Sequence, residues 1–297
     1  MKMTRRDFIT TTGALAGAAM LTLHAARADK GGSPLSPAIN PVFLTGSLDG
    51  WPLADLAAIG YRGLELTPAC LDNPAPWLAQ AEEAGLALFA VNALPDLRPY
   101  LTGSLSDAVE HRRRATLDRL LATLRRMREL HVPFLVVAPS RLAENYQSVE
   151  EARALLVESL RELAAAGDAT ILLEGAPFRL FASAAEIAAL VDAVASSQVA
   201  AALDVGHCLL RGESPADAAK TLGPHLRYVQ VHDAEVRCGF PLLDAHLPLG
   251  LGAAGRQDVL AAIADRPCAV TVTAPDDPLS AAREALAWLT GQRESPG

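Results

Sequence analysis

The chain has 297 residues, of which 51% are hydrophobic and 20% are charged, and its formal net charge at pH 7 is −8. This length suits one large domain with its own core, and the composition excludes a disordered chain. Proteins that bind nucleic acid normally carry the opposite charge balance, so the acidic charge argues against nucleic acid as a partner.

The N-terminus carries the pattern of a targeting segment. Residues 4–9 contain twin arginines, a weakly apolar run follows to residue 23, and residues 26–28 read as a small-residue cleavage site. The apolar run is too short, and too rich in Gly, Thr and Ala, to span a membrane stably. We therefore expect residues 1–28 to be a cleaved signal peptide for the twin-arginine export machinery, and the mature protein to be periplasmic without stable membrane insertion.

After a Gly/Ser/Pro-rich linker at residues 29–37, short apolar runs alternate with amphipathic stretches. The runs predict strands at residues 42–44, 63–66, 86–91, 133–137, 171–173, 199–203, 226–231 and 269–272. The amphipathic stretches predict helices at residues 51–59, 74–84, 105–131, 148–166, 183–195, 214–222, 259–264 and 279–289. Eight strands, each followed by a helix, predict an α/β fold, a single-domain (β/α)8 TIM barrel over residues 38–297. An open doubly wound sheet is the alternative, but no Gly-rich phosphate loop follows any strand.

Several predicted strands end in side chains that can ligate a metal. Glu174 follows the fifth run, Asp204 and His207 follow the sixth, and His232 follows the seventh. Burying such groups is costly unless they share a cation. In a barrel of this class the carboxyl ends of the strands carry the site, and Glu65 lies at the corresponding place in the second strand.

These motifs carry a resemblance to a known family. Residues 61–66, 171–174, 204–207, 231–233 and 244–252 resemble the xylose isomerase-like barrel superfamily, which holds sugar phosphate isomerases and epimerases, ketose 3-epimerases, inosose dehydratases and apurinic endonucleases. The resemblance covers the layout of the whole mature chain and is sharpest from the fifth strand to the eighth. It implies a metal-dependent enzyme with a small carbohydrate as its substrate.

The resemblance also implies roles for individual residues. Glu174, Asp204 and His232 match metal ligands of the epimerases, and the metal-bound Glu174 would move a proton as base or acid. The substrate-binding set that the resemblance implies is Glu65, His207, Asp244 and His246. In endonuclease-like members, the positions of His207, Asp244 and His246 ligate further metals. Two carboxylates with imidazole suit Mn²⁺, Zn²⁺, Fe²⁺, Co²⁺ or Mg²⁺, and such an ion acidifies a C–H bond beside a polarised carbonyl.

The chain departs from the family pattern in the eighth strand. Epimerase members end that strand with a second glutamate, whereas Thr273 occupies the place here, with Asp276 and Asp277 in the loop behind it. The endonuclease histidines after the third and fourth strands are also absent, since Asn92 and residues 138–140 stand there. A three-metal nuclease site is therefore disfavoured.

Three functions remain open from the sequence. The first is an exported metal-dependent isomerase or epimerase, or a lyase, acting on a carbohydrate or cyclitol derivative by proton transfer. The second is a metal-dependent hydrolase of the same fold. The third is a degenerate barrel that binds a carbohydrate without turning it over, which the replacement of the eighth-strand glutamate by Thr273 favours.

Overall fold

The computed structural model describes residues 37–40, 51–93, 104–139, 148–177, 179–235, 246–264, 266–271 and 277–292. All of these residues belong to one compact unit, Ser36–Gly297. No helix in these ranges combines the length and the apolarity that crossing a membrane requires. The expected signal peptide at residues 1–28 lies outside the described residues and stays a prediction.

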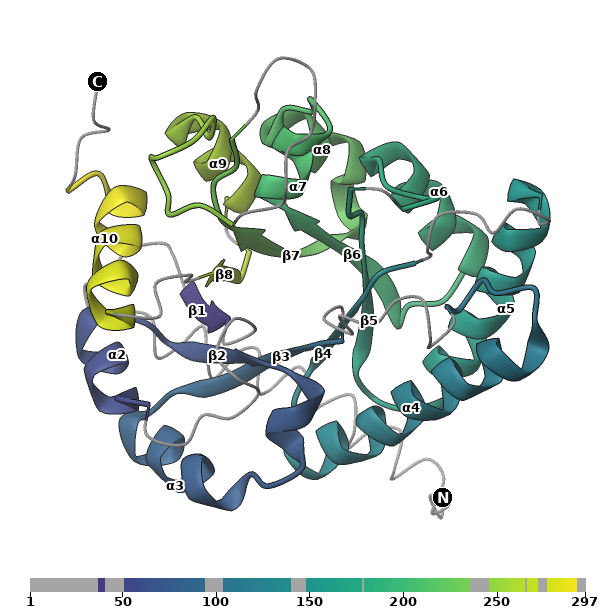
Figure 1. Ribbon diagram of the computed structural model, residues 1–297, viewed down its shortest axis with the longest axis horizontal. Helices are drawn as coiled ribbons and strands as arrows, with labels where there is room; N and C mark the ends of the chain where they lie inside the picture. Colours follow the sequence, from purple (N-terminus) through teal and green to yellow (C-terminus); the bar gives the residue numbers. More distant parts are fainter. Residues whose placement is uncertain are drawn as a thin grey trace, which may run out of the picture. The chain divides into compact units, whose positions relative to one another are not determined.

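Eight parallel strands pair in chain order, and β8 pairs with β1 to close a barrel (Figure 1). The strands are β1 (Pro37–Asn40), β2 (Gly63–Leu66), β3 (Ala87–Asn92), β4 (Phe134–Val137), β5 (Thr170–Glu174), β6 (Val199–Asp204), β7 (Leu226–Val231) and β8 (Cys268–Thr271). The predicted fold class, a parallel α/β barrel, is confirmed.

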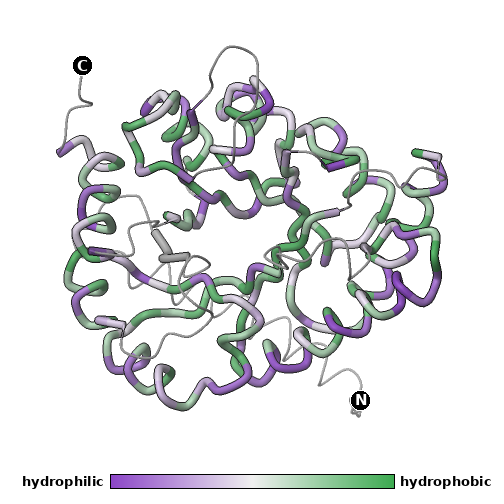
Figure 2. The backbone as a smooth tube through the Cα atoms, in the orientation of Figure 1, coloured by the Kyte–Doolittle hydropathy of each residue, from purple (hydrophilic) through white to green (hydrophobic). Residues whose placement is uncertain are grey.

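The helices stand outside the ring of strands (Figure 1), and Figure 2 shows hydrophilic residues along their outer sides. They are α2 (Leu53–Ile59), α3 (Ala75–Ala84), α4 (Glu110–Glu129), α5 (Val149–Ala166), α6 (Ala184–Val194), α7 (Val205–Leu210), α8 (Pro215–Leu222), α9 (Arg256–Ile263) and α10 (Pro278–Thr290), with short 3-10 turns η2 (Pro68–Leu71) and η3 (Gly223–His225). This arrangement lets each helix bury its apolar face against the sheet.

Capping side chains fix where the helices after β4 and β5 begin. Ser148 accepts a hydrogen bond from the Glu151 N–H at 3.0 Å, as its position before α5 predicts. Ser183 and Glu186 form a reciprocal capping box at the start of α6, in which each side chain accepts from the other residue's backbone N–H. The two caps therefore fix the residues at which α5 and α6 begin.

The structure differs from the prediction at the first strand. β1 is Pro37–Asn40, whereas the strand was expected at residues 42–44, which lie outside the described residues. Pro37, assigned to the linker, is instead the first residue of the barrel. The sequence of β1 has no strand-like apolar run, and its extended form comes from pairing with β2 and β8. Barrel closure overrides local propensity here.

The short helix α7 is a second difference, because no helix was expected directly after β6. Its N-cap is Asp204, whose carboxylate accepts a hydrogen bond from the His207 N–H at 3.0 Å. One residue thus ends a strand, starts a helix and faces the barrel mouth. The turn brings His207 back over the strand end that carries Asp204.

The barrel interior changes from apolar to polar along the strands. Near the amino ends the packed core is apolar, with Ala90, Val136, Leu172, Ala200, Ala202, Tyr228 and Ala269 at its centre. Side chains two residues apart in a strand point the same way. The next inward positions are Asn92, Glu174, Asp204, Gln230, His232 and Thr271, all of them buried. The polar residues therefore gather at the carboxyl ends of the strands, where the site was predicted.

Candidate metal centre

Two buried carboxylates define the centre. Glu174 is the last residue of β5 and Asp204 the last of β6, with exposed fractions of 1% and 5%. His207 Nδ1 lies 2.8 Å from Glu174 Oε1. Since Asp204 also accepts the His207 backbone N–H, His207 bridges the two acids from the first turn of α7.

His232, the residue after β7, joins the same cluster from the other side. Its side chain is fully buried, and its Nε2 atom lies 2.9 Å from Asp204 Oδ1. Its Nδ1 atom lies 3.0 Å from the carbonyl oxygen of Asp233. A carbonyl oxygen only accepts, so Nδ1 carries the hydrogen of this contact, and Nε2 is the atom that faces Asp204. Such a second contact is the usual way in which a metal-ligating histidine is oriented.

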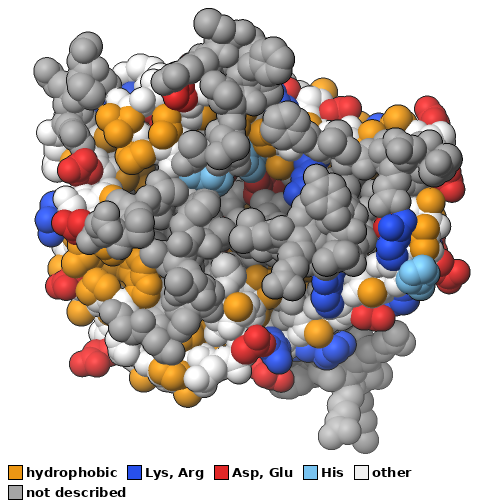
Figure 3. Space-filling view, in the orientation of Figure 1, with side chains coloured by type: hydrophobic (Ala, Val, Ile, Leu, Met, Phe, Trp, Pro, Cys, Tyr) orange, Lys and Arg blue, Asp and Glu red, His pale blue; other side chains and the backbone are white. Residues whose placement is uncertain are grey.

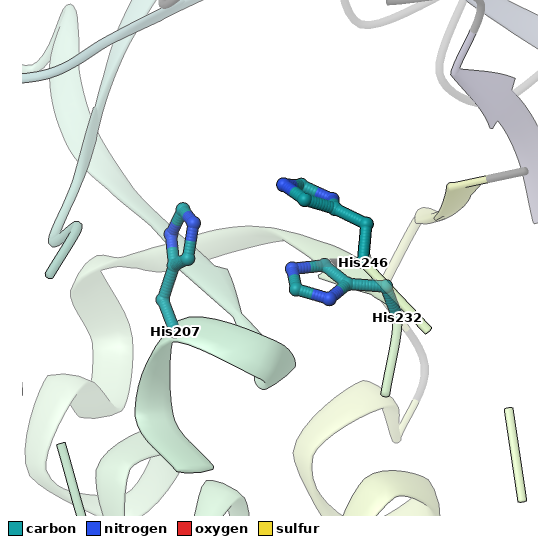
Figure 4. Close-up of side chains that lie close together, drawn as sticks. All are labelled: His207, His232 and His246. Carbon is teal, nitrogen blue, oxygen red and sulfur yellow. The ribbon is translucent and has the colours of Figure 1, made fainter. Parts of the chain in front are cut away.

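His246 completes a group of three imidazoles. Its ring stacks on that of His232 with a centroid separation of 3.9 Å, and His207 meets both rings edge-on at 5.6 and 6.1 Å (Figure 4). His246 has a backbone φ of 45°, in the left-handed region that non-glycine residues rarely adopt. On the face drawn in Figure 3, histidine and acidic side chains lie close together near the middle of the barrel.

Two overlapping sets of ligand atoms result. The donor atoms of Glu174, Asp204 and His207 lie within 4.8 Å of one another, and so do those of His207, His232 and His246. His207, which the family resemblance assigns to substrate contact, belongs to both sets. The three predicted ligands are therefore divided: Glu174 and Asp204 belong to the first set, whereas His232 belongs to the second. His232 reaches the first set through its contact with Asp204.

Burial raises the pKa values of Glu174 and Asp204, whereas the neighbouring imidazoles lower them. Burial is the main cause that raises the pKa of Glu174, and the His207 imidazole opposes it. For Asp204, burial also acts to raise the pKa, but the His207 and His232 imidazoles overcome it and hold the pKa well below its ordinary value. Two neighbouring buried carboxyls of this kind are stable when positive charge lies between them.

The residues present fit a divalent ion. Within the described part of the chain, Glu174 Oε2 is buried and has no hydrogen-bond partner. A buried acceptor left in this way is costly unless a ligand completes it. Carboxylate oxygens together with imidazole nitrogens form the donor set that Zn²⁺, Mn²⁺, Fe²⁺ and Co²⁺ accept. Glu174, Asp204 and His207, whose donor atoms lie within 4.8 Å of one another, are the residues that would hold the ion, and the role of His232 as a further ligand stays a prediction.

Glu65 occupies a separate place deeper in the barrel. Its fully buried carboxyl accepts hydrogen bonds from Asn92 Nδ2 at 2.9 Å, Gln230 Nε2 at 2.7 Å and the Tyr228 hydroxyl at 2.8 Å. Burial is the main cause that raises its pKa to about 7, although these three hydrogen bonds act the other way. A role for Glu65 in binding substrate stays a prediction.

The raised pKa of Glu65 makes stability depend on pH. The folded chain keeps this proton up to about pH 7, whereas the unfolded chain loses it near the ordinary value of 4.5. Between these values the unfolded state binds fewer protons, so stability falls as pH rises, by about 3 kcal/mol in total. In urea unfolding of metal-free protein, the stability of the wild type relative to Glu65→Gln is expected to fall by this amount from pH 4.5 to 7.5. If the difference in unfolding free energy between the wild type and Glu65→Gln stayed constant over this pH range, Glu65 would not be protonated in the folded chain.

The remaining sequence candidates are only partly within the described residues. Asp244, Thr273 and Asp276 lie outside them. Asp277, which could have replaced the eighth-strand glutamate from the loop, instead caps α10, and its Oδ1 accepts a hydrogen bond from the Ser280 N–H at 2.9 Å. This capping role gives the Asp277 carboxylate a partner on α10.

Sequence reasoning missed three features of the centre. Gln230 and Tyr228 hold Glu65, and their alternation with His232 along β7 is the signal that could have found them. Asp233 was not among the predicted site residues, but its carboxylate is fully buried and accepts hydrogen bonds from four backbone amides. Gly206 leaves the space in which the His232 ring lies, since a Cβ there would be 1.9 Å from His232 Cε1.

Barrel, strand-end carboxylates and imidazoles together define a protein of the xylose isomerase-like class. A family model described as "Xylose isomerase-like TIM barrel" matches residues 53–292, and the chain belongs to this family. A search of curated proteins gives no significant match.

Three solved structures illustrate how widely the same fold is shared. Apo 3-keto-D-glucoside 4-epimerase from E. coli is 17% identical, with a TM-score of 0.68 over 86% of this chain and 99% of that one. D-psicose 3-epimerase from Clostridium cellulolyticum H10, solved with D-tagatose, is 18% identical, with a TM-score of 0.66 over 88% and 99%. The IOLI protein, solved with a zinc atom, is 16% identical, with a TM-score of 0.70 over 88% and 100%. At these identities the likeness establishes the fold.

Proposed function

We propose that the protein is a metal-dependent isomerase or epimerase of a carbohydrate or cyclitol derivative, acting by proton transfer. The observation that carries the proposal is the contact of two buried strand-end carboxylates, Glu174 and Asp204, with the imidazoles of His207 and His232. Such a cluster is expensive to bury for structure alone. Perturbed carboxyls gathered at the carboxyl ends of barrel strands are typical of a catalytic site.

Glu174 is the proposed proton-transfer residue. Its Oε1 atom is held 2.8 Å from His207 Nδ1, while Oε2 has no hydrogen-bond partner in the described part of the chain. Oε2 is therefore the atom proposed to take a proton from the carbon beside the substrate carbonyl. Delivery of this proton to the adjacent carbon gives an isomer, whereas inversion of a single carbon needs a proton supplied from its opposite face. Burial raises the pKa of Glu174, which makes its carboxylate a stronger base than an exposed one.

Asp204 and His232 hold and orient the proposed centre. Their contact at 2.9 Å fixes both side chains, and the Asp233 carbonyl fixes the His232 ring from behind. A bound divalent ion would polarise a substrate carbonyl and acidify the neighbouring C–H bond. The Asp204 carboxylate is held ionised by the imidazoles, so it is a ligand and not a proton carrier.

The substrate class comes from the comparisons and from the N-terminus. The neighbours named as 3-keto-D-glucoside 4-epimerase and D-psicose 3-epimerase act on unphosphorylated sugars by name, and we infer a similar small substrate here. The twin arginines in residues 4–9 support export to the periplasm, where phosphorylated intermediates of the cytosol are not expected. The proposed substrate is therefore a free or oxidised sugar.

A barrel that binds a carbohydrate without turning it over is the second candidate. It is favoured by Thr273, which stands where epimerases of this family carry a second glutamate. Without that glutamate, Glu174 is the carboxyl group proposed to transfer the proton at the reacting carbon. The two candidates share the fold and the cation but differ in whether a C–H bond is broken.

A panel of free and oxidised sugars, incubated in D₂O with protein loaded with Co²⁺, Mn²⁺ or Zn²⁺, tests the proposal. The expected result is an epimer or isomer of at least one sugar, with solvent deuterium at the carbon beside the carbonyl. Cleavage products without deuterium would indicate a hydrolase instead. Saturable binding of a sugar with no exchange under any metal would support the non-catalytic barrel.

A further inference from the structure

Asp233 makes an unusual set of contacts for a residue beside a metal centre. Its carboxylate is fully buried, and Oδ1 accepts the backbone N–H groups of Ala234 and Ala254, both at 2.8 Å. Oδ2 accepts those of Gly250 and Gly252, both at 2.9 Å. Two oxygens of a carboxylate offer about four acceptor positions, so its capacity is filled by the chain itself.

Three of these amides belong to one segment, residues 246–254, called the His246 loop below. The loop is also joined to Asp233 through the main chain, since Leu247 and Asp233 exchange two backbone hydrogen bonds of 2.8 and 2.9 Å. Close approach is possible because residue 252 is glycine: a Cβ there would lie 2.4 Å from Asp233 Oδ1. The carboxylate thus gathers the loop around one buried negative charge.

The same residue reaches both members of the stacked imidazole pair. The Asp233 carbonyl contacts His232 Nδ1 at 3.0 Å, and its carboxylate holds the loop that begins with His246. The rings of His232 and His246 lie 3.9 Å apart (Figure 4). His246 adopts a φ of 45°, which persists only where surrounding contacts over-determine the backbone. The Leu247 pairing with Asp233 provides such a contact on the adjoining residue.

We propose that Asp233 is a positioning residue, whose carboxylate fixes the His246 loop and so sets the His246 ring against His232 at the mouth of the centre. This placement of the imidazole pair is a property of the chain alone. Its consequence for cation binding rests on the function proposed above. The contacts distinguish Asp233 from a ligand, because its oxygens point into backbone amides.

The test substitutes Asp233→Asn, which keeps the volume but turns an amide NH₂ toward backbone donors. In ¹³C–¹H NMR spectra of metal-free protein, the imidazole signals of His232 and His246, assigned by His246→Ala, are expected to shift as the stacking is lost. The control is Asp107→Asn, which removes another buried aspartate that accepts a backbone N–H and pairs with Arg112. This control is expected to lower stability while leaving both imidazole signals in place.

Cation binding gives a readout that loss of stability alone does not move. Asp233→Asn is expected to weaken Co²⁺ binding about 10–100-fold, the size of effect that loss of an outer partner of a metal site has, because the loop that sets His246 against His232 is released. The contact of the Asp233 carbonyl with His232 is kept in this variant. If Asp233 acts through His246, the effects of Asp233→Asn and His246→Ala on Co²⁺ affinity are non-additive in a double-mutant cycle. Strictly additive effects, or imidazole signals unmoved in Asp233→Asn, would overturn the proposal.

Hydrogen exchange of the unmodified protein covers the case in which Asp233→Asn does not fold. The amides of Gly250, Gly252 and Ala254 are expected to be protected in the metal-free native state. Exchange at the rate of an open loop would show that the Asp233 carboxylate does not fix the His246 loop. A wild type that binds no Co²⁺ would instead remove the proposed function. The NMR and exchange results would still decide the role of Asp233.

Discussion

Glu174→Gln is expected to weaken Co²⁺ binding by about 100-fold or more and to abolish deuterium exchange into substrate. The variant removes a buried carboxylate that supplies both a metal donor and the proton-transfer atom, and even outer contacts of a metal site are worth about 10–100-fold. Glutamine keeps the volume and the polar contact with His207, which lies 2.8 Å from Glu174 Oε1. Isothermal titration of metal-free protein with Co²⁺ measures the first effect, and NMR of substrate in D₂O the second.

Although Glu174→Gln is expected to lose Co²⁺ affinity, its free energy of unfolding without metal is not expected to fall. Burial disfavours the charge of Glu174, so a neutral glutamine is expected to leave the metal-free protein at least as stable as the wild type in urea unfolding. The control is Glu213→Gln, a glutamate that pairs with Arg211 at 2.9 Å and is not a proposed ligand. If Glu174→Gln bound Co²⁺ normally and lost several kcal/mol of stability, Glu174 would be a structural ion-pair residue.

Gly206→Ala is expected to displace His232 and to weaken Co²⁺ binding about 10–100-fold. A Cβ at residue 206 would lie 1.9, 2.3 and 2.5 Å from three atoms of the His232 ring, distances that real structures do not tolerate. Since Gly206 lies in α7 and His232 follows β7, the ring has to move out of contact with Asp204. Overpacking of this kind typically costs about 1–3 kcal/mol of stability as well.

Gly167→Ala is the matched control for this substitution. Gly167 has an extended backbone, with φ of −152°, and the nearest atom to its added Cβ would be 3.8 Å away, an ordinary contact. This control is expected to keep wild-type Co²⁺ affinity. Equal affinity in Gly206→Ala and wild type would show that the position of His232 does not determine binding.

Much of the fold could be predicted because the strands of the barrel are buried on both faces. Their apolar runs, such as residues 226–231, predict strands without knowledge of their neighbours. β1 could not be located in this way, since Pro37–Asn40 becomes a strand only through its pairing with Cys268–Thr271 and with β2. Local sequence carries no record of a partner more than two hundred residues away.

The site was predictable in outline because strand ends are where functional side chains of a barrel lie. The positions of Glu174, Asp204 and His232 follow from that rule. The contact of His207 with Glu174 could not be predicted, since it depends on the short helix that Asp204 caps. The four amides on Asp233 were equally hidden, because three come from a loop 17–21 residues further along the chain.

The most direct test of the central claim is the location of a bound cation. In crystals of the protein soaked with Zn²⁺ or Co²⁺, the anomalous difference map collected at the metal edge is expected to contain a peak about 2.0–2.3 Å from donor atoms of Glu174, Asp204 and His232. A map without a peak between these residues, or with the ion bound only by groups elsewhere in the chain, would contradict the account.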